Sequence, residues 1–136
     1  MIQQIEIILP AFNRGYHLIT AIINSEMKKI PETGMLNIFI KHSSAALCIN
    51  ENADPSVRAD FESFMNKMIP ENDSCYTHIY EGEDDMPAHI KSSLFGPSLT
   101  IPISNGHLNL GTWQGIYLCE FRNHGGQRKL VLTIYS

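Results

Sequence analysis

The stretch LTIPISNGHLNLGTWQGIYLCEFRNHGGQRKLVLTIY, residues 99–135, decides the fold class. Within it, Asn105-Gly106 is a strong signal for a two-residue hairpin turn, and Gly125-Gly126 is expected to turn the last strand back along the one before it. Apolar and β-branched residues between these turns predict four strands in close succession, over 99–103, 107–110, 116–122 and 129–135. Strands joined by such short connections pair antiparallel.

The chain before residue 99 mixes strands with a first helix. Alternating apolar residues predict strands over 4–9 and 36–41, and weaker patterns predict short strands over 45–50 and 75–80. Apolar residues at helical spacing predict a helix that begins near Tyr16 and stops before residue 31.

Two further helices carry clear start signals. Asp54 is placed as the N-cap and Pro55 as the first residue of a helix that Pro70 ends. Asp84-Asp85 precede a third helix, over 86–95, with the acidic residues at the end where a helix favours them.

The bulk composition is that of one small globular protein. With 43% hydrophobic and 18% charged residues over 136 positions, a single hydrophobic core is the default. The elements lack a regular strand–helix alternation, so we predict a single α+β domain over residues 1–136, a mostly antiparallel sheet with helices. Ten Lys and Arg residues against fourteen Asp and Glu residues give a net charge of −4. The scattered basic residues argue against a nucleic-acid partner.

The cysteines and the N-terminus indicate the compartment. Cys48, Cys75 and Cys119 lie far apart without a C-x-x-C pair, and an odd number of unpaired thiols suits a reducing environment. The first residues lack the basic start and the apolar run of a signal peptide, and no apolar stretch approaches the roughly 20 residues that cross a bilayer. We therefore expect a cytoplasmic protein with no membrane partner.

The polar segment from Tyr80 to Ser93 departs most from a packing pattern. On a helix, Asp85 and His89 are four residues apart and share a face, with Ser92 one turn further on. A carboxylate orients an imidazole and raises its basicity, so Asp85 and His89 are candidates for catalysis or metal binding. The alternative is that Asp84 or Asp85 simply caps the helix and that His89 is a surface residue.

Two other histidines are candidates to join His89 in a metal site. His42 follows the strand over 36–41 with the parity of its buried face, and His78 lies in the middle of the strand predicted over 75–80. Three histidines from separate elements can hold Zn²⁺ with an open fourth position. The alternative is that all three are satisfied core or surface histidines, because their spacing matches no compact zinc motif.

Three further stretches are candidates for substrate binding or catalysis. Trp113 between Thr112 and Gln114 offers a rigid aromatic face beside hydrogen-bonding groups, which suits a planar heterocycle, although a tryptophan that plugs the core fits equally well. Ser43-Ser44 can hold a phosphate through hydroxyl and backbone N–H groups. Glu51 can add a catalytic carboxylate, its default role being the entry to the following helix.

Four of these stretches carry a family resemblance. They are HSSAAL (42–47), NENADP (50–55), EGEDDMPAHIKSSL (81–94) and LGTWQGIYL (110–118). In these stretches, which follow the family's order, the sequence resembles the YjbQ-like family, a group described as secondary thiamine-phosphate synthases. Ser43 stands where threonine is usual in the family and keeps the hydroxyl group.

The resemblance implies an α+β fold that assembles as a homotrimer, with orthogonally packed sheets around the threefold axis. A partner subunit would also cover the strand over 116–121, which carries apolar residues on both faces. The implied activity is a secondary thiamine-phosphate synthase, which joins hydroxymethylpyrimidine diphosphate to a thiazole phosphate and releases pyrophosphate. The family positions that carry over are His42, Glu51, His78, Asp85, His89, Thr112 and Gln114.

These residues suit chemistry in which pyrophosphate leaves a carbon atom. Asp85 can help to hold a metal on the diphosphate, His89 can protonate or orient the leaving group, and Lys91, Ser92 and Ser93 can cradle phosphate oxygens. The expected metal is Zn²⁺ on the imidazoles, and the rival is Mg²⁺ that arrives with the diphosphate. Two other functions stay open, a metal-dependent hydrolase that uses the same cluster and a non-catalytic trimer that binds small anions.

Overall fold

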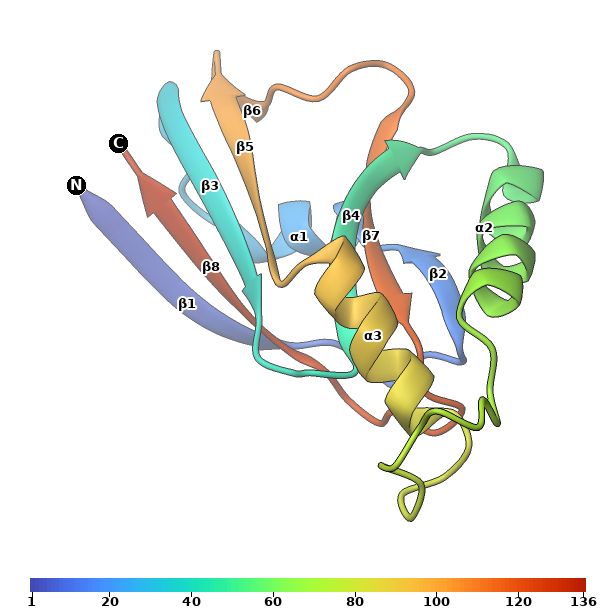
Figure 1. The fold of residues 1–136 in the computed structure, drawn as a ribbon. Helices are drawn as coiled ribbons and strands as arrows, with labels where there is room; N and C mark the ends of the chain where they lie inside the picture. The colour runs from blue at the N-terminus through green and yellow to red at the C-terminus, as the bar shows by residue number, and fades with distance from the viewer.

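A computed structural model describes residues 1–136 and contains two antiparallel sheets and three helices (Figure 1). The five-stranded sheet has the order β1-β8-β3-β5-β6 and the three-stranded sheet the order β2-β7-β4. Every strand pair is antiparallel, which confirms the predicted α+β class. The elements are β1 (Ile2–Ile8), β2 (Gly15–Leu18), α1 (Thr20–Glu26), β3 (Thr33–Ile40), β4 (Ala45–Glu51), α2 (Pro55–Met68), α3 (Asp85–Phe95), β5 (Ser98–Ser104), β6 (His107–Leu108), β7 (Gln114–Glu120) and β8 (Lys129–Tyr135).

Two layers of apolar side chains hold these elements together. The larger layer lies between the sheets, where Leu36, Ile38 and Leu132 of the five-stranded sheet pack with Leu47 and Leu118 of the other. The smaller layer lies between the three-stranded sheet and the helices α2 and α3, which stand on its other side (Figure 1). Its members are Tyr16, Ala46, Met65, Ile69, Ala88, Tyr117, Cys119 and Phe121.

The strand β7 is buried on both faces within one chain. Residues 115–120 are all buried, because the five-stranded sheet covers one face and the two helices cover the other. The expectation that a partner subunit must cover this strand is therefore wrong. One group of exposed apolar side chains lies instead on the outer face of the five-stranded sheet, where Ile2, Tyr135 and Met35 form a row across β1, β8 and β3.

The two glycine-containing turns behave differently. Asn105 and Gly106 form the predicted hairpin between β5 and β6, with positive φ angles of 53° and 74°, so this prediction is confirmed. The predicted turn at Gly125-Gly126 is wrong as a hairpin, because β7 and β8 belong to different sheets. The chain crosses between the sheets here, and a buried ion pair of 2.6 Å between Glu120 and Arg128 spans the crossing.

Two other local predictions are wrong. Residues 16–18 pair with β7 as part of β2, and the helix α1 begins only after them. Residues 75–80 form no strand but a loop between α2 and α3, in which the side chain of Asp73 accepts a hydrogen bond from the backbone N–H of Cys75 at 2.9 Å. His78 therefore lies on a loop.

The first and last strands of the chain pair along their whole length. The register runs from Ile2 opposite Tyr135 to Ile8 opposite Lys129, and the two marked chain ends lie close together in Figure 1. The strand β8 also pairs with β3, so it lies in the interior of its sheet. None of the helices is long and apolar enough to span a membrane.

Candidate functional site

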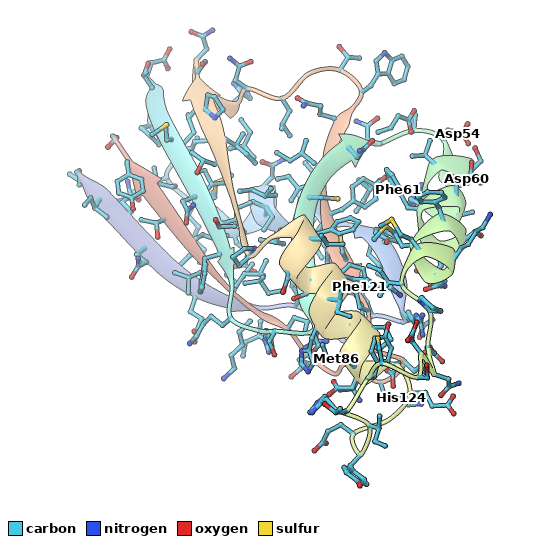
Figure 2. All side chains as sticks on the ribbon, in the orientation of Figure 1. Asp54, Asp60, Phe61, Met86, Phe121 and His124 are labelled. Carbon is cyan, nitrogen blue, oxygen red and sulfur yellow. The ribbon has the colours of Figure 1, made fainter.

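The helix α3 begins at two acidic residues that are almost completely buried. Arg122, just beyond the end of β7, binds both of them, since its Nε donates to Oδ2 of Asp84 at 2.9 Å and its Nη1 donates to Oδ1 of Asp85. Buried carboxylates require such partners. In Figure 2, Met86 and His124 mark this end of the molecule, where the start of α3 meets the loop that follows β7.

Two histidines share the second oxygen of Asp85. The Nε2 atom of His78 lies 2.7 Å from Oδ2 of Asp85, and the Nε2 atom of His89 lies 3.1 Å from the same oxygen. His89 reaches Asp85 from one turn later on α3, as the four-residue spacing predicts. His78 comes from the loop before α3, and the two ring centroids are 5.5 Å apart.

The tautomer of His89 follows from its other ring nitrogen. The Nδ1 atom lies 2.9 Å from the carbonyl oxygen of Ser43, and a carbonyl only accepts, so Nδ1 carries a proton. In the neutral ring, Nε2 then presents a lone pair to the carboxylate oxygen of Asp85, which is also an acceptor. Two acceptors at this distance need a proton or a cation between them.

The residues present fit a divalent metal ion. The ligand atoms of His78, Asp85 and His89 all lie within 4.8 Å of one another. Tetrahedral Zn²⁺ with bonds of about 2.0–2.1 Å places its ligands roughly 3.3 Å apart, so the contacts to Asp85 need to lengthen by less than about 1 Å. Two imidazoles and one carboxylate form a donor set typical of catalytic zinc, which keeps one position open. The side chain of His78 is 50% exposed, so one side of the cluster faces solvent.

Asp85 is held as a carboxylate. Burial acts to raise the pKa of Asp85, but the hydrogen bond from His78 and the neighbouring His89 and Arg122 outweigh burial and hold the pKa below its ordinary value. The neighbouring Asp84 has a lowered pKa in the same way, since hydrogen bonds from Arg122 and a backbone N–H outweigh its burial. A metal ligand or a proton acceptor needs this ionised form.

The third predicted histidine ligand, His42, lies outside the cluster. Its Nε2 accepts a hydrogen bond from the backbone N–H of Lys129 at 2.8 Å, because the chain beyond β3 runs beside the start of β8. Ser43, the next residue, is the one whose carbonyl reaches His89. The structure thus brings together two of the three predicted histidines, and Asp85 takes the place of His42.

The predicted phosphate-binding residues fall into two sets. Ser43 and Ser92 lie beside the cluster, and the hydroxyl of Ser92 donates to the carbonyl of Ser43 at 2.9 Å. The hydroxyl of Ser93 donates to the backbone carbonyl of His89, one turn earlier on α3, also at 2.9 Å. Lys91 points elsewhere: it is 1% exposed, and its Nζ donates to Oδ1 of Asn66 at 2.7 Å. Lys91 is therefore unable to hold a phosphate at the surface of the cluster.

Glu51, Thr112, Trp113 and Gln114 gather at the other end of the three-stranded sheet. In the register of β4 and β7, Glu51 lies opposite Gln114, six residues along β4 from the strand end nearest the histidines. At about 3.3 Å a residue, this distance is about 20 Å. Within one chain, these residues do not reach the cluster.

These four residues make local contacts of their own. The carboxylate of Glu51 accepts from the backbone N–H of Asp54 at 2.9 Å, at the entry to α2. The side chain of Gln114 accepts from the N–H of Gly111 at 2.8 Å. Trp113 is 65% exposed, so the interpretation of this residue as a core plug is wrong and its indole face is available to a ligand or to another protein.

Comparison with known proteins identifies the family. The family described as UPF0047 protein YjbQ-like matches residues 5–136. The chain belongs to the YjbQ-like family. It is 53% identical over 123 residues to the UPF0047 protein YjbQ of Salmonella typhimurium, which covers 89% of this chain and 88% of that protein. It is 47% identical over 128 residues to the UPF0047 protein YjbQ of Escherichia coli O157:H7, with coverage of 93% and 92%.

Solved structures share the YjbQ-like fold. An uncharacterized conserved protein of the YjbQ/UPF0047 family from Clostridium acetobutylicum is 40% identical, with a TM-score of 0.80 and coverage of 96% of this chain and 98% of that one. A YbjQ-like protein of unknown function from Sulfolobus solfataricus is 23% identical, with a TM-score of 0.86 and coverage of 98% and 96%, which shows likeness of fold alone. The predicted family and fold are confirmed.

Two arginines and one glutamate of the YjbQ-like chain were missed by sequence reasoning. Arg122 holds both aspartates, and Glu120 binds Arg128 through both carboxylate oxygens at 2.6 and 2.7 Å. Arg128 also donates to the hydroxyl of Ser44 at 3.1 Å. A signal was present, because Glu120 is the one charged residue in the otherwise apolar run 115–121, and a buried charge requires a partner of opposite sign. No local pattern shows which arginine that partner is.

Proposed function

We propose that the chain is a metal-dependent transferase that forms thiamine phosphate from hydroxymethylpyrimidine diphosphate and a thiazole phosphate, with release of pyrophosphate. One observation carries the proposal: two imidazole nitrogens meet on one oxygen of Asp85, while Arg122 holds the other oxygen. The family resemblance suggests the substrates, and the cluster offers the chemistry.

The difficult step is the departure of pyrophosphate from the pyrimidinylmethyl carbon, because negative charge builds on the leaving oxygen. The thiazole nitrogen forms the new bond to that carbon as the bond to oxygen breaks. A divalent ion at the cluster would supply positive charge to the diphosphate. His78, Asp85 and His89 would hold the ion, while the carbonyl of Ser43 fixes the ring of His89 and Arg122 keeps Asp85 ionised and oriented.

The donor set favours Zn²⁺ as the resident ion. Imidazole nitrogen suits zinc, whereas Mg²⁺ prefers oxygen ligands and keeps several waters. In the rival arrangement, Asp85 would hold a Mg²⁺ ion that accompanies the diphosphate, while His78 and His89 would donate hydrogen bonds to phosphate oxygens. The two arrangements differ in whether the purified protein carries metal before substrate is added.

The proposal includes a homotrimer. Support comes from the exposed row of Ile2, Met35 and Tyr135, an apolar surface on the uncovered face of the five-stranded sheet. A role for Glu51, Thr112, Trp113 and Gln114 in the same reaction requires that they reach the cluster of a neighbouring protomer, since about 20 Å separates them from it in one chain.

The test is the formation of thiamine phosphate by Asp85→Asn. This change keeps the shape of the side chain and removes its charge, so we expect the rate to fall at least about tenfold. The matched control is Asp60→Asn, at an exposed position on α2 that points away from the sheets (Figure 2), which should keep the wild-type rate. A folded Asp85→Asn variant with an unchanged rate would remove the cluster from the reaction.

A metal-dependent hydrolase is the second candidate. The half-exposed side chain of His78 leaves the cluster open to water, which can act as the nucleophile at a bound metal. A hydrolase releases pyrophosphate from hydroxymethylpyrimidine diphosphate without the thiazole, whereas the transferase requires both substrates. A trimer that only binds small anions would release no product in either assay.

The proposed partners and compartment follow from the same features. The ligand is a small phosphorylated heterocycle, and the net charge of −4 disfavours nucleic acid. All three cysteines are free thiols, and one of them, Cys75, is exposed, which suits the reducing cytoplasm.

A further inference from the structure

A polar pocket lies beside the cluster, where the end of β3 meets the start of β8. It is shallow and open, with a volume of about 580 Å³. Its polar lining residues are Lys41, His42, Ser43, Ser44 and Arg128, and no acidic residue lines it. Lys41 and Arg128 each bind a carboxylate outside this lining, Glu6 and Glu120, both at 2.6 Å, so the pocket can attract an anion through its hydrogen-bond donors rather than through unpaired positive charge.

His42 offers this pocket a hydrogen-bond donor. Its Nε2 accepts from the backbone N–H of Lys129 at 2.8 Å, so this nitrogen holds a lone pair and the proton of the neutral ring is on Nδ1. Burial and the nearby cations Arg128 and Lys129 hold the pKa of His42 below its usual range, which keeps the ring neutral. The Nδ1–H group donates to no other group of the protein.

Arg128 offers a second donor. Its Nε and Nη2 atoms are occupied by Glu120 and Ser44, at distances of 2.6–3.4 Å. Its Nη1 makes no hydrogen bond in the protein and is not enclosed by it. A buried guanidinium whose position is fixed by a carboxylate, with one nitrogen left over, is a preorganised anion donor.

We infer that this pocket binds a phosphate or diphosphate group through Nδ1 of His42, Nη1 of Arg128 and the hydroxyl of Ser43. The backbone of Ser43 links the pocket to the cluster, because its carbonyl accepts from His89 and Ser92. The inference rests on the proposed function only for the identity of the molecule that carries the phosphate. It gives His42 the role of an anion donor in place of a metal ligand.

The test titrates metal-free protein with inorganic phosphate and with pyrophosphate and follows the histidine ring nitrogens by NMR. The Nδ1 resonance of His42 should move with either anion, and that of His107, in the exposed β5–β6 hairpin, should not. His42→Phe removes the donor and should weaken binding at least about tenfold, while the matched control His107→Phe should bind as the wild type does. His42→Gln keeps an acceptor for the N–H of Lys129 and should weaken binding without disturbing the fold.

Two results would overturn the inference. One is the absence of any change at His42 with up to roughly 10 mM anion, a concentration that fills about 90% of a site with a Kd of about 1 mM. The other is a response of His78 and His89 without one of His42, which would place the anion at the cluster. The measurement needs neither metal nor turnover. Phosphate binding at His42 by a protein that makes no thiamine phosphate would therefore sustain this inference and contradict the proposed function.

Discussion

We expect Gly125→Ala to destabilise the protein more than Gly126→Ala, although the two glycines are neighbours in the crossing between the sheets. A Cβ atom on Gly125 would lie 2.2 Å from Oε1 of Glu120 and 2.7 Å from Nη2 of Arg128. Gly126 has a φ angle of 71°, but a Cβ atom there would meet nothing within 4 Å. Gly125 is required because side chains approach its Cα closely, and Gly126 is required because its backbone is left-handed.

The magnitudes follow from these two causes. Relief of the contact at Gly125 moves one member of the buried Glu120–Arg128 pair, and disruption of a buried ion pair costs about 3–5 kcal/mol. A left-handed backbone at a residue with a Cβ atom costs about 1–2 kcal/mol, which is the loss expected for Gly126→Ala. The difference of about 2 kcal/mol corresponds to about 1 M in the midpoint of urea unfolding.

The assay is urea unfolding followed by circular dichroism, with all variants at one protein concentration because the proposed assembly would contribute to stability. A third variant, Gly126→Asn, should recover most of the loss of Gly126→Ala, since asparagine tolerates the left-handed region. The same change at Gly125 should recover nothing. Equal midpoints for Gly125→Ala and Gly126→Ala would refute the assignment of a steric role to Gly125.

Three further predictions concern the site. Elemental analysis should find zinc in His42→Ala but not in His89→Ala, and equal zinc in both variants would contradict a metal site at the cluster. Zinc binding should weaken below about pH 6, where imidazoles generally take up protons. Lys91→Met should keep the rate of thiamine phosphate formation. It should also raise the free energy of unfolding at pH 7 by about 1–2 kcal/mol, and a variant less stable than the wild type would contradict this prediction. Burial lowers the pKa of Lys91 from 10.5, so the wild type, unlike this variant, should gain stability as the pH rises through that lowered pKa. Mixed trimers of Asp85→Asn and Trp113→Ala protomers should recover up to roughly a quarter of the activity, and no recovery would argue against a site shared between protomers.

The part of the site that lies on one helix could be predicted from the sequence, because helical geometry alone fixes the contact between Asp85 and His89. The rest depends on distant segments. His78 lies beside Asp85, but on a loop rather than on the predicted strand, since hydrogen bonds within the loop and not a sheet place its segment. The ring of His42 is held by a residue 87 positions away, which no local pattern encodes.

The same division holds for the fold. Asn105-Gly106 closes a hairpin through its own backbone preference, so the sequence predicts it. The turn at Gly125-Gly126 has an equally clear local signal, yet the strands beside it belong to different sheets, since β8 pairs with β1 and β3 and β7 pairs with β2 and β4. Glu120 and Arg128 bind each other across this crossing. No local pattern in the sequence pairs these two charges, so their contact is known only from the tertiary structure.

The place of β8 between β1 and β3 sets an order of events during synthesis. The ribosome releases β1, β3, β5 and β6 before residues 129–135, so the five-stranded sheet lacks an interior strand until nearly all of the described chain has emerged. Until then the facing edges of β1 and β3 carry unpaired backbone groups that invite pairing with other chains. The five-stranded sheet therefore forms only after residues 129–135 have left the ribosome, and we expect the edges of β1 and β3 to need shielding from other chains until then.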